Sequence, residues 1–156
     1  LPIRFNLGVL FWTPVISILM GLTADAVTSL SGGYNYFTTE IFQYIKPLSI
    51  FDKFAALAPM AILYGLLNGF YEEFCFLGLL TCVEDKYKWQ ALAYSTLVRV
   101  SFHTYQGMLW ATVIGVVFGL MYYFFYKYKV KNLLPFFLIH ALADIFGSGF
   151  IYLICA

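Results

Sequence analysis

The chain has 156 residues, of which 62% are apolar and 11% are charged, whereas an ordinary soluble domain has roughly 45–50% apolar and about 25% charged residues. Its mean hydropathy is +0.82, and aromatic residues make up 21% of it. This composition excludes a disordered chain, and it excludes a nucleic-acid-binding protein, which needs a basic face. The net charge of +1 points to no partner. The high apolar content is that of a membrane protein, so we expect the chain to lie in a lipid bilayer.

The length allows one domain with about five spanning helices, at about 20 residues per crossing plus connections. We expect an all-α fold, a polytopic helical membrane protein whose spans surround a polar intramembrane cavity. We expect a single domain over residues 1–156, with its motif-bearing core over residues 54–156. The chain begins with Leu1 rather than methionine, which leaves open whether further spans precede it.

Five apolar segments are the predicted spans: residues 3–22, 54–83, 90–105, 107–126 and 132–154. After a turn at residues 23–25, residues 26–52 mix glycine, polar and aromatic residues, which is typical of a loop followed by an interfacial helix. A tight turn is predicted at Gln106-Gly107. Two glycine pairs inside the spans predict close helix packing: Gly65 with Gly69, and Gly115 with Gly119.

Lysines predict the orientation, because Lys86 and Lys88 precede the third span and Lys127, Lys129 and Lys131 follow the fourth. Two crossings place both groups on one side, which the positive-inside rule makes cytoplasmic. We expect a multi-pass protein of a bacterial cell membrane. The side chains expected in the interfacial belt or facing lipid are Tyr122, Tyr123, Tyr126, Tyr128, Phe136 and Phe137.

Six ionisable side chains lie within the predicted spans: Glu72, Glu73, Arg99, His103, His140 and Asp144. Such a group is costly in a membrane unless it is paired or hydrated, so each is a functional-site hypothesis. Each histidine shares a helical face with a charged residue four positions away. The two glutamates are about 100° apart on a helix, so only one can point straight at a shared centre. Carboxylates and imidazoles gathered in low dielectric can hold and deprotonate a water molecule.

Three motifs, in this order, resemble those of a known family. EEFCFLG at residues 72–78 resembles EExxxR, RVSFH at 99–103 resembles FxxxH, and HALAD at 140–144 resembles HxxxN/D. From residue 54 to the C-terminus the chain therefore resembles the CPBP intramembrane proteases, which include the CAAX prenyl endopeptidases and the bacteriocin-processing and immunity (Abi-like) proteins. Leu77 stands where the family usually has arginine, and Arg99 stands where it usually has phenylalanine. We infer that Arg99 supplies the missing cation and pairs with Glu73 or Asp144.

The resemblance implies a role for each site residue. Glu72 and His103 would activate water, and His140 would stabilise the oxyanion, where a donor is worth about 2.7–4 kcal/mol. Glu73 either belongs to the catalytic site or supports it through a hydrogen bond. Asp144 must be protonated, orient His140 or pair with Arg99, since an ionised carboxylate only accepts hydrogen bonds.

Metal dependence stays open, because Glu72, His103 and His140 would also suit zinc. We favour a metal-free mechanism, since the chain has no HExxH motif. Asn68 is expected to make a hydrogen bond between helices, and Tyr105 and Gln106 either line the substrate entrance or form the turn.

The resemblance implies hydrolysis of a peptide bond in a membrane-associated peptide or protein. We expect the processing of a bacteriocin or signalling peptide, or immunity, rather than cleavage of prenylated proteins. A proton-coupled transporter could use the same carboxylates and histidines. A catalytically inactive immunity or scaffold protein is the third alternative, for which Leu77 is the motivating feature.

Overall fold

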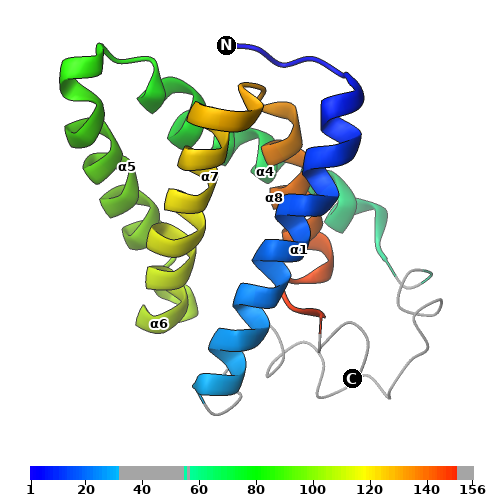
Figure 1. Ribbon diagram of the computed structural model, residues 1–156. Helices are drawn as coiled ribbons and strands as arrows, with labels where there is room; N and C mark the ends of the chain where they lie inside the picture. The colour runs from blue at the N-terminus through cyan, green and yellow to red at the C-terminus, as the bar shows by residue number, and fades with distance from the viewer. Residues whose placement is uncertain (32–54, 56, 151–156) are drawn as a thin grey trace.

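The computed structural model describes residues 1–31, 55 and 57–150, and over these residues the chain is helical, without any strand (Figure 1). The all-α prediction is therefore confirmed for the described residues. The segment predicted as a loop and an interfacial helix lies mostly outside them, as does the end of the fifth predicted span.

Helix α1 covers Leu7–Leu30 and is longer than the predicted first span. It begins after Asn6, whose side chain accepts a hydrogen bond from the backbone N–H of Val9 at 3.1 Å, as a good N-cap does. The prediction of a turn at residues 23–25 is wrong. Thr23 donates its hydroxyl hydrogen bond to the carbonyl of Leu19, at 2.8 Å, so a polar residue is accommodated within the helix without breaking it.

The second predicted span is an irregular helix. Helix α4 covers Pro59–Glu73, beginning with a proline in the first turn, where its missing N–H costs nothing. A π-helical turn at Phe74–Gly78 and a 3₁₀ turn at Leu79–Thr81 continue it. The widened π turn lies directly after the two glutamates, a placement often found at functional sites.

The third and fourth predicted spans form a helical hairpin. A 3₁₀ turn at Asp85–Tyr87 leads into α5, Lys88–Phe102, and a second one follows at Thr104–Gln106. Gly107 then reverses the chain with a φ of 88°, a conformation that glycine adopts readily, and this confirms the predicted turn. The returning helix consists of α6, Met108–Thr112, a π-helical stretch, Val113–Phe118, α7, Gly119–Phe125, and a π-helical end, Tyr126–Val130.

The last described helix is α8, Leu134–Phe146, which ends at Gly147 with a φ of 82°. It is shorter than the predicted fifth span, because the positive φ of Gly147 ends the helix there. In the described part of the chain, two helices are long and apolar enough to cross a membrane, Leu7–Leu30 and Met108–Val130. The count rises to three if Pro59–Thr81 and Asp85–Phe102, which meet at 113°, form one broken span. The figure of five spans stays a prediction.

Close packing of α4 against α8 brings the motif-bearing helices together, as the first predicted glycine pair requires. A methyl group on Gly69 would lie 2.8 Å from the backbone N of Ala141 and 2.8 Å from the backbone O of Phe137. One on Gly65 would lie 2.8 Å from the side chain of Ile145. Since only glycine permits this approach, these residues bring the glutamates of α4 next to the histidine of α8.

The core lies between α1, α7 and α8, and it contains most of the aromatic residues that were expected to face lipid. Tyr122, Tyr123, Tyr126, Phe136 and Phe137 are all buried, so that prediction is wrong for five of the six residues. The rings of Tyr122 and Phe136 meet edge to face at 5.3 Å. Hydropathy alone does not separate a side chain that faces lipid from one that faces a neighbouring helix, because both surroundings are apolar.

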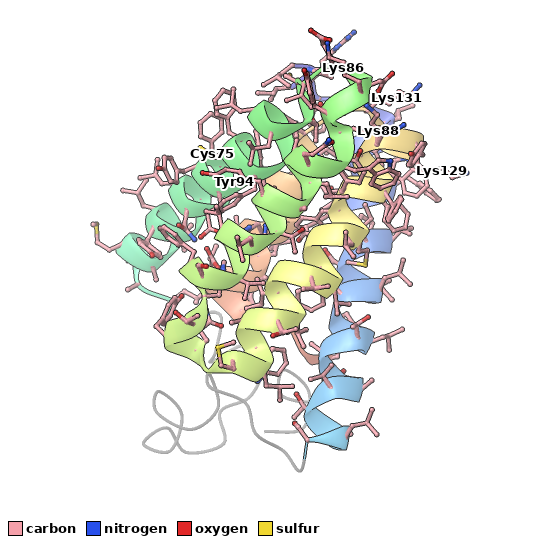
Figure 2. The ribbon with its side chains drawn as sticks, turned by 90° about the vertical axis from the view of Figure 1, so that its left-hand side faces the viewer. Cys75, Lys86, Lys88, Tyr94, Lys129 and Lys131 are labelled. Carbon is pink, nitrogen blue, oxygen red and sulfur yellow. The ribbon has the colours of Figure 1, made fainter. Side chains whose placement is uncertain are left out.

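The basic residues gather at one end of the helices. Figure 2 shows Lys86, Lys88, Lys129 and Lys131 at the same end of the molecule. Lys127 lies there as well, 3.4 Å from a carboxylate oxygen of Asp85. The lysines before the third predicted span and those after the fourth therefore lie at one end, as expected if the chain between them runs away from that end and returns. The α4–α5 and α7–α8 connections lie at this basic end (Figure 1 and Figure 2).

Candidate active site

The site is built around Glu73, the last residue of α4, whose side chain is fully buried. Arg99 of α5 binds it with two parallel hydrogen bonds, from Nη1 to Oε1 and from Nη2 to Oε2, each of 2.9 Å. A bidentate guanidinium–carboxylate pair combines charge neutralisation with fixed geometry. The sequence left two partners open for Arg99, Glu73 and Asp144. In the structure, Arg99 pairs with Glu73.

Several neighbours hold Arg99 in place. Its guanidinium lies 4.9 Å above the ring of Phe76, a cation–π arrangement. Gly119 of α7 faces its aliphatic stem, with a hypothetical methyl group there 3.6 Å from Cδ of Arg99. Leu77, at the position where the resemblance expects arginine, is instead 2% exposed in the apolar core. The cation therefore reaches Glu73 from α5 rather than from the helix that carries Glu73.

His140 of α8 is the second partner of Glu73. Its Nδ1 lies 2.7 Å from Oε1 of Glu73. Because an ionised carboxylate can only accept, Nδ1 carries the hydrogen of this bond. The other ring nitrogen, Nε2, points to the remaining carboxylates, 3.8 Å from Oε2 of Glu72 and 3.7 Å from Oδ1 of Asp144.

Glu72 differs from its neighbour in having no arginine or lysine bound to it among the described residues. Its Oε1 accepts a hydrogen bond of 3.2 Å from the side-chain amide of Asn68. Its Oε2 is buried and has no hydrogen-bond partner among the described residues. This oxygen lies 3.8 Å from Nε2 of His103 and 3.8 Å from Nε2 of His140. Both separations are too long for a direct hydrogen bond and suit a bridging water molecule.

The protonation of His103 follows from its backbone partner. This residue ends α5, and its Nδ1 lies 2.8 Å from the backbone carbonyl oxygen of Arg99. A carbonyl oxygen only accepts, so Nδ1 carries the hydrogen, and Nε2 of the neutral ring is an acceptor. In this tautomer each histidine presents Nε2 to Glu72: the nitrogen of a neutral ring offers a lone pair, and that of a fully protonated ring donates.

Asn68 joins the two carboxylates that the site leaves without a cation. Its amide nitrogen donates to Oδ2 of Asp144 at 2.9 Å and to Oε1 of Glu72 at 3.2 Å. The sequence predicted an interhelical hydrogen bond for Asn68 but not this double contact. The spacing of Asn68 and Glu72, four residues apart on one helix face, is the signal that could have indicated it.

A small cavity of ≈ 40 Å³ lies beside the two histidines, and one water molecule needs about 10–15 Å³ of such volume. Its lining includes Arg99, His103, His140 and Asp144, together with Gln106, whose Oε1 is buried without a hydrogen-bond partner among the described residues. Gln106 was one of the two residues considered for the substrate entrance. Its amide donates to the hydroxyl of Tyr105 at 2.8 Å.

The side chains as placed do not fit a metal ion. Zinc ligands lie at about 2.0–2.2 Å from the metal, so two ligand atoms of one tetrahedral ion are roughly 3.3 Å apart. The 3.8 Å separations of Glu72 from the two histidines exceed this. Within residues 1–31, 55 and 57–150, no group of three or more His, Cys, Asp or Glu side chains could hold a metal ion.

Comparison with known protein families assigns the chain to one of them. The model of the family described as "Type II CAAX prenyl endopeptidase Rce1-like" matches residues 54–146, which is more than half of the chain. The chain belongs to the Rce1-like family. The resemblance found in the three motifs is thereby confirmed, and all six ionisable site residues fall inside the matched range. Searches of curated proteins and of solved structures found no match.

Membership of the Rce1-like family makes the chain a CAAX-type intramembrane protease at the level of the family. The apolar helices agree with a membrane protein. The arrangement of the side chains described above suits the activation of water, and the roles of individual residues are taken up next.

Proposed function

We propose that this Rce1-like protein hydrolyses a peptide bond of a membrane-associated peptide or protein, with water activated by Glu72 and His103 and without a metal ion. One observation carries the proposal: Oε2 of Glu72 lies 3.8 Å from Nε2 of both histidines. One of these nitrogens is an acceptor because its ring partner is a carbonyl, and the other can donate because its ring partner is a carboxylate.

A water molecule placed between Glu72 and His103 meets two acceptors. Glu72 takes one proton as the water oxygen attacks the carbonyl carbon of the scissile bond, and Nε2 of His103 accepts the hydrogen bond of the other O–H. The tetrahedral intermediate then collapses as Glu72 returns its proton to the leaving nitrogen. The C–N bond breaks, leaving a carboxyl group on one fragment and an amine on the other.

The negative charge of the intermediate needs a donor on the opposite side. Nε2 of His140 serves this purpose when the ring is an imidazolium, whose Nδ1 donates to Glu73. Glu73 is itself held by Arg99, so it orients His140 and does not act as a base. A donor positioned in advance, in a site of low dielectric, stabilises the developing oxyanion more than water would.

The surroundings of the site favour an apolar substrate segment. A second cavity of ≈ 320 Å³ shares Met20, Ala143 and Ser148 with the small cavity beside the histidines, and most of its lining is apolar. Such a cavity accepts an aliphatic or aromatic side chain next to the reacting bond. We propose that the substrate is a bacteriocin or signalling peptide of a bacterial membrane, with prenylated protein as the alternative to which the name of the family points.

The test is cleavage of a membrane-peptide library by the purified protein in liposomes. The wild type is compared with Glu72→Gln and His103→Ala, and with Thr112→Ala as the control, since the exposed hydroxyl of Thr112 donates to the carbonyl of Met108 in its own helix. We expect both site variants to lose about 10²–10⁴-fold in rate while remaining folded, and the control to match the wild type.

Three results would count against the proposal. Cleavage that survives in Glu72→Gln would remove Glu72 from the role of base. A wild type that cleaves nothing across a broad library, but conducts protons through vesicles in a Glu72-dependent way, would support a transporter. Immunity that survives Glu72→Gln would support a catalytically inactive protein.

A further inference from the structure

Asn68 is a neutral side chain that contacts Glu72 and Asp144, the two carboxylates of the site to which Arg99 is not bound. It lies on α4, one turn before Glu72, and it is half-buried. Its amide nitrogen donates to Glu72 of its own helix and to Asp144 of α8, at 3.2 and 2.9 Å. Its contacts therefore connect the two helices at the reacting centre.

The chemistry of these contacts defines the orientation of the amide. Ionised carboxylates accept hydrogen bonds and cannot donate them, so the nitrogen rather than the oxygen of Asn68 must face both. An NH₂ group has two hydrogens, one for each carboxylate. It places a partial positive charge between two like charges that would otherwise repel each other.

The bond to Glu72 also determines which oxygen is left for chemistry. Oε1 of Glu72 accepts the hydrogen bond from Asn68, so Oε2 of Glu72 remains turned toward the two histidines. In the same way, the bond to Oδ2 of Asp144 leaves Oδ1 turned toward His140, at 3.7 Å. Rotation of either carboxylate about its terminal bond would break a hydrogen bond to Asn68.

We propose that Asn68 is a positioning residue, which aims Oε2 of Glu72 at the reacting water and holds Asp144 beside His140. This inference rests on the proposed hydrolytic function. It predicts that Asn68 affects the rate of the chemical step, and not only the association of α4 with α8. That association has an independent basis in the contacts of Gly65 and Gly69 with α8.

The experiment compares Asn68→Ala and Asn68→Asp with Asn132→Ala in liposomes. Asn132 is a matched control, since it is a buried asparagine whose amide bonds a distant backbone carbonyl, that of Arg4, at 2.7 Å. It lies outside the site. For each variant, kcat, KM, the pH dependence of kcat and the thermal unfolding midpoint are measured.

We expect Asn68→Ala to lower kcat by about tenfold or more with little change in KM. Asn68→Asp is nearly isosteric, and it gathers a third carboxylate with Glu72 and Asp144, next to His103, His140 and the Arg99–Glu73 pair. Like charges disfavour ionisation of the base, so the acidic limb of its rate profile should move to higher pH. Asn132→Ala should lower the unfolding midpoint while its kcat and pH profile stay those of the wild type.

A kcat of Asn68→Ala close to that of the wild type, or one that falls only as the folded fraction falls, would overturn the inference. If that variant does not fold, an unshifted pH profile of Asn68→Asp would overturn it. The proposed function can stand in either case, because Glu72→Gln would still abolish cleavage. If instead Glu72→Gln retains full cleavage, the proposed function fails, and the role of Asn68 fails with it.

Discussion

Arg99 and Glu73 form a buried, two-bonded ion pair between α5 and the end of α4, although 26 positions separate them in the chain. The pair gives adjacent glutamates different properties. Glu73 has both oxygens bound to a cation, whereas Glu72 has one oxygen without a partner among the described residues. A carboxylate held in a tight ion pair is a poor base, so this difference supports the proposal that Glu72 transfers the proton and that Glu73 has a supporting role.

The first prediction concerns the removal of this cation. Arg99→Leu leaves the carboxylate of Glu73 buried without its partner, and breaking a buried pair in this way costs about 3–5 kcal/mol. We expect a lower unfolding midpoint and loss of cleavage, measured on the purified protein in detergent and in liposomes. A variant that folds and cleaves like the wild type would show that Arg99 does not supply the charge that Leu77 lacks.

Moving the cation tests the same relationship in a second way. Leu77→Arg combined with Arg99→Phe rebuilds the arrangement that the family usually has, with arginine four residues after Glu73. We expect the double variant to recover part of the stability and activity that Arg99→Phe alone loses. No recovery would mean that the π-helical turn at Phe74–Gly78 keeps residue 77 from reaching Glu73.

The second prediction concerns His140 as the donor to the oxyanion. His140→Ala removes the imidazole between Glu73 and the reacting centre, and the loss of one such donor lowers kcat by about 10²–10³-fold. KM should change little, since the interaction forms mainly in the transition state. Steady-state kinetics on one cleaved peptide measures both constants. An increase in KM at unchanged kcat would instead assign His140 to substrate binding.

The sequence was sufficient to select the six ionisable residues that the structure brings together, because helical spacing and charge in an apolar segment are strong signals. It predicted the shared face of His140 and Asp144, and it predicted that only one of the two adjacent glutamates can point straight at a shared centre. It did not predict the contact of Asn68 with Asp144, which depends on how α4 packs against α8. The burial of Tyr122 was missed because the lipid and the core are equally apolar.

The third prediction concerns metal removal. Because the distances between Glu72, His103 and His140 exceed those around one tetrahedral zinc ion, we expect dialysis against a chelator to leave cleavage unchanged. The measurement is activity before and after dialysis, with metal content determined on the same samples. Loss of activity that added zinc restores would reverse this view and make Glu72, His103 and His140 the candidate ligands.

The last prediction concerns the glycine pair of the fourth predicted span, whose two members differ in the structure. A methyl group on Gly115 would lie 2.8 Å from the backbone N of Val100, where the main chain cannot yield easily. We expect Gly115→Ala to separate α5 from the returning helix at a cost of about 1–3 kcal/mol. A methyl group on Gly119 would lie no closer than 3.6 Å to any of its three nearest neighbours, Cδ and Nε of Arg99 and the backbone O of Ile114, which are ordinary contacts.

Gly119→Ala is therefore the matched control for Gly115→Ala, since both add the same group to the same helix one turn apart. Thermal unfolding in detergent should show a lower midpoint for Gly115→Ala and a midpoint near that of the wild type for Gly119→Ala. Because α5 carries Arg99 and ends at His103, the shift of α5 should also lower kcat in Gly115→Ala. Equal midpoints for the two variants would mean that α5 does not pack against Gly115 as closely as described.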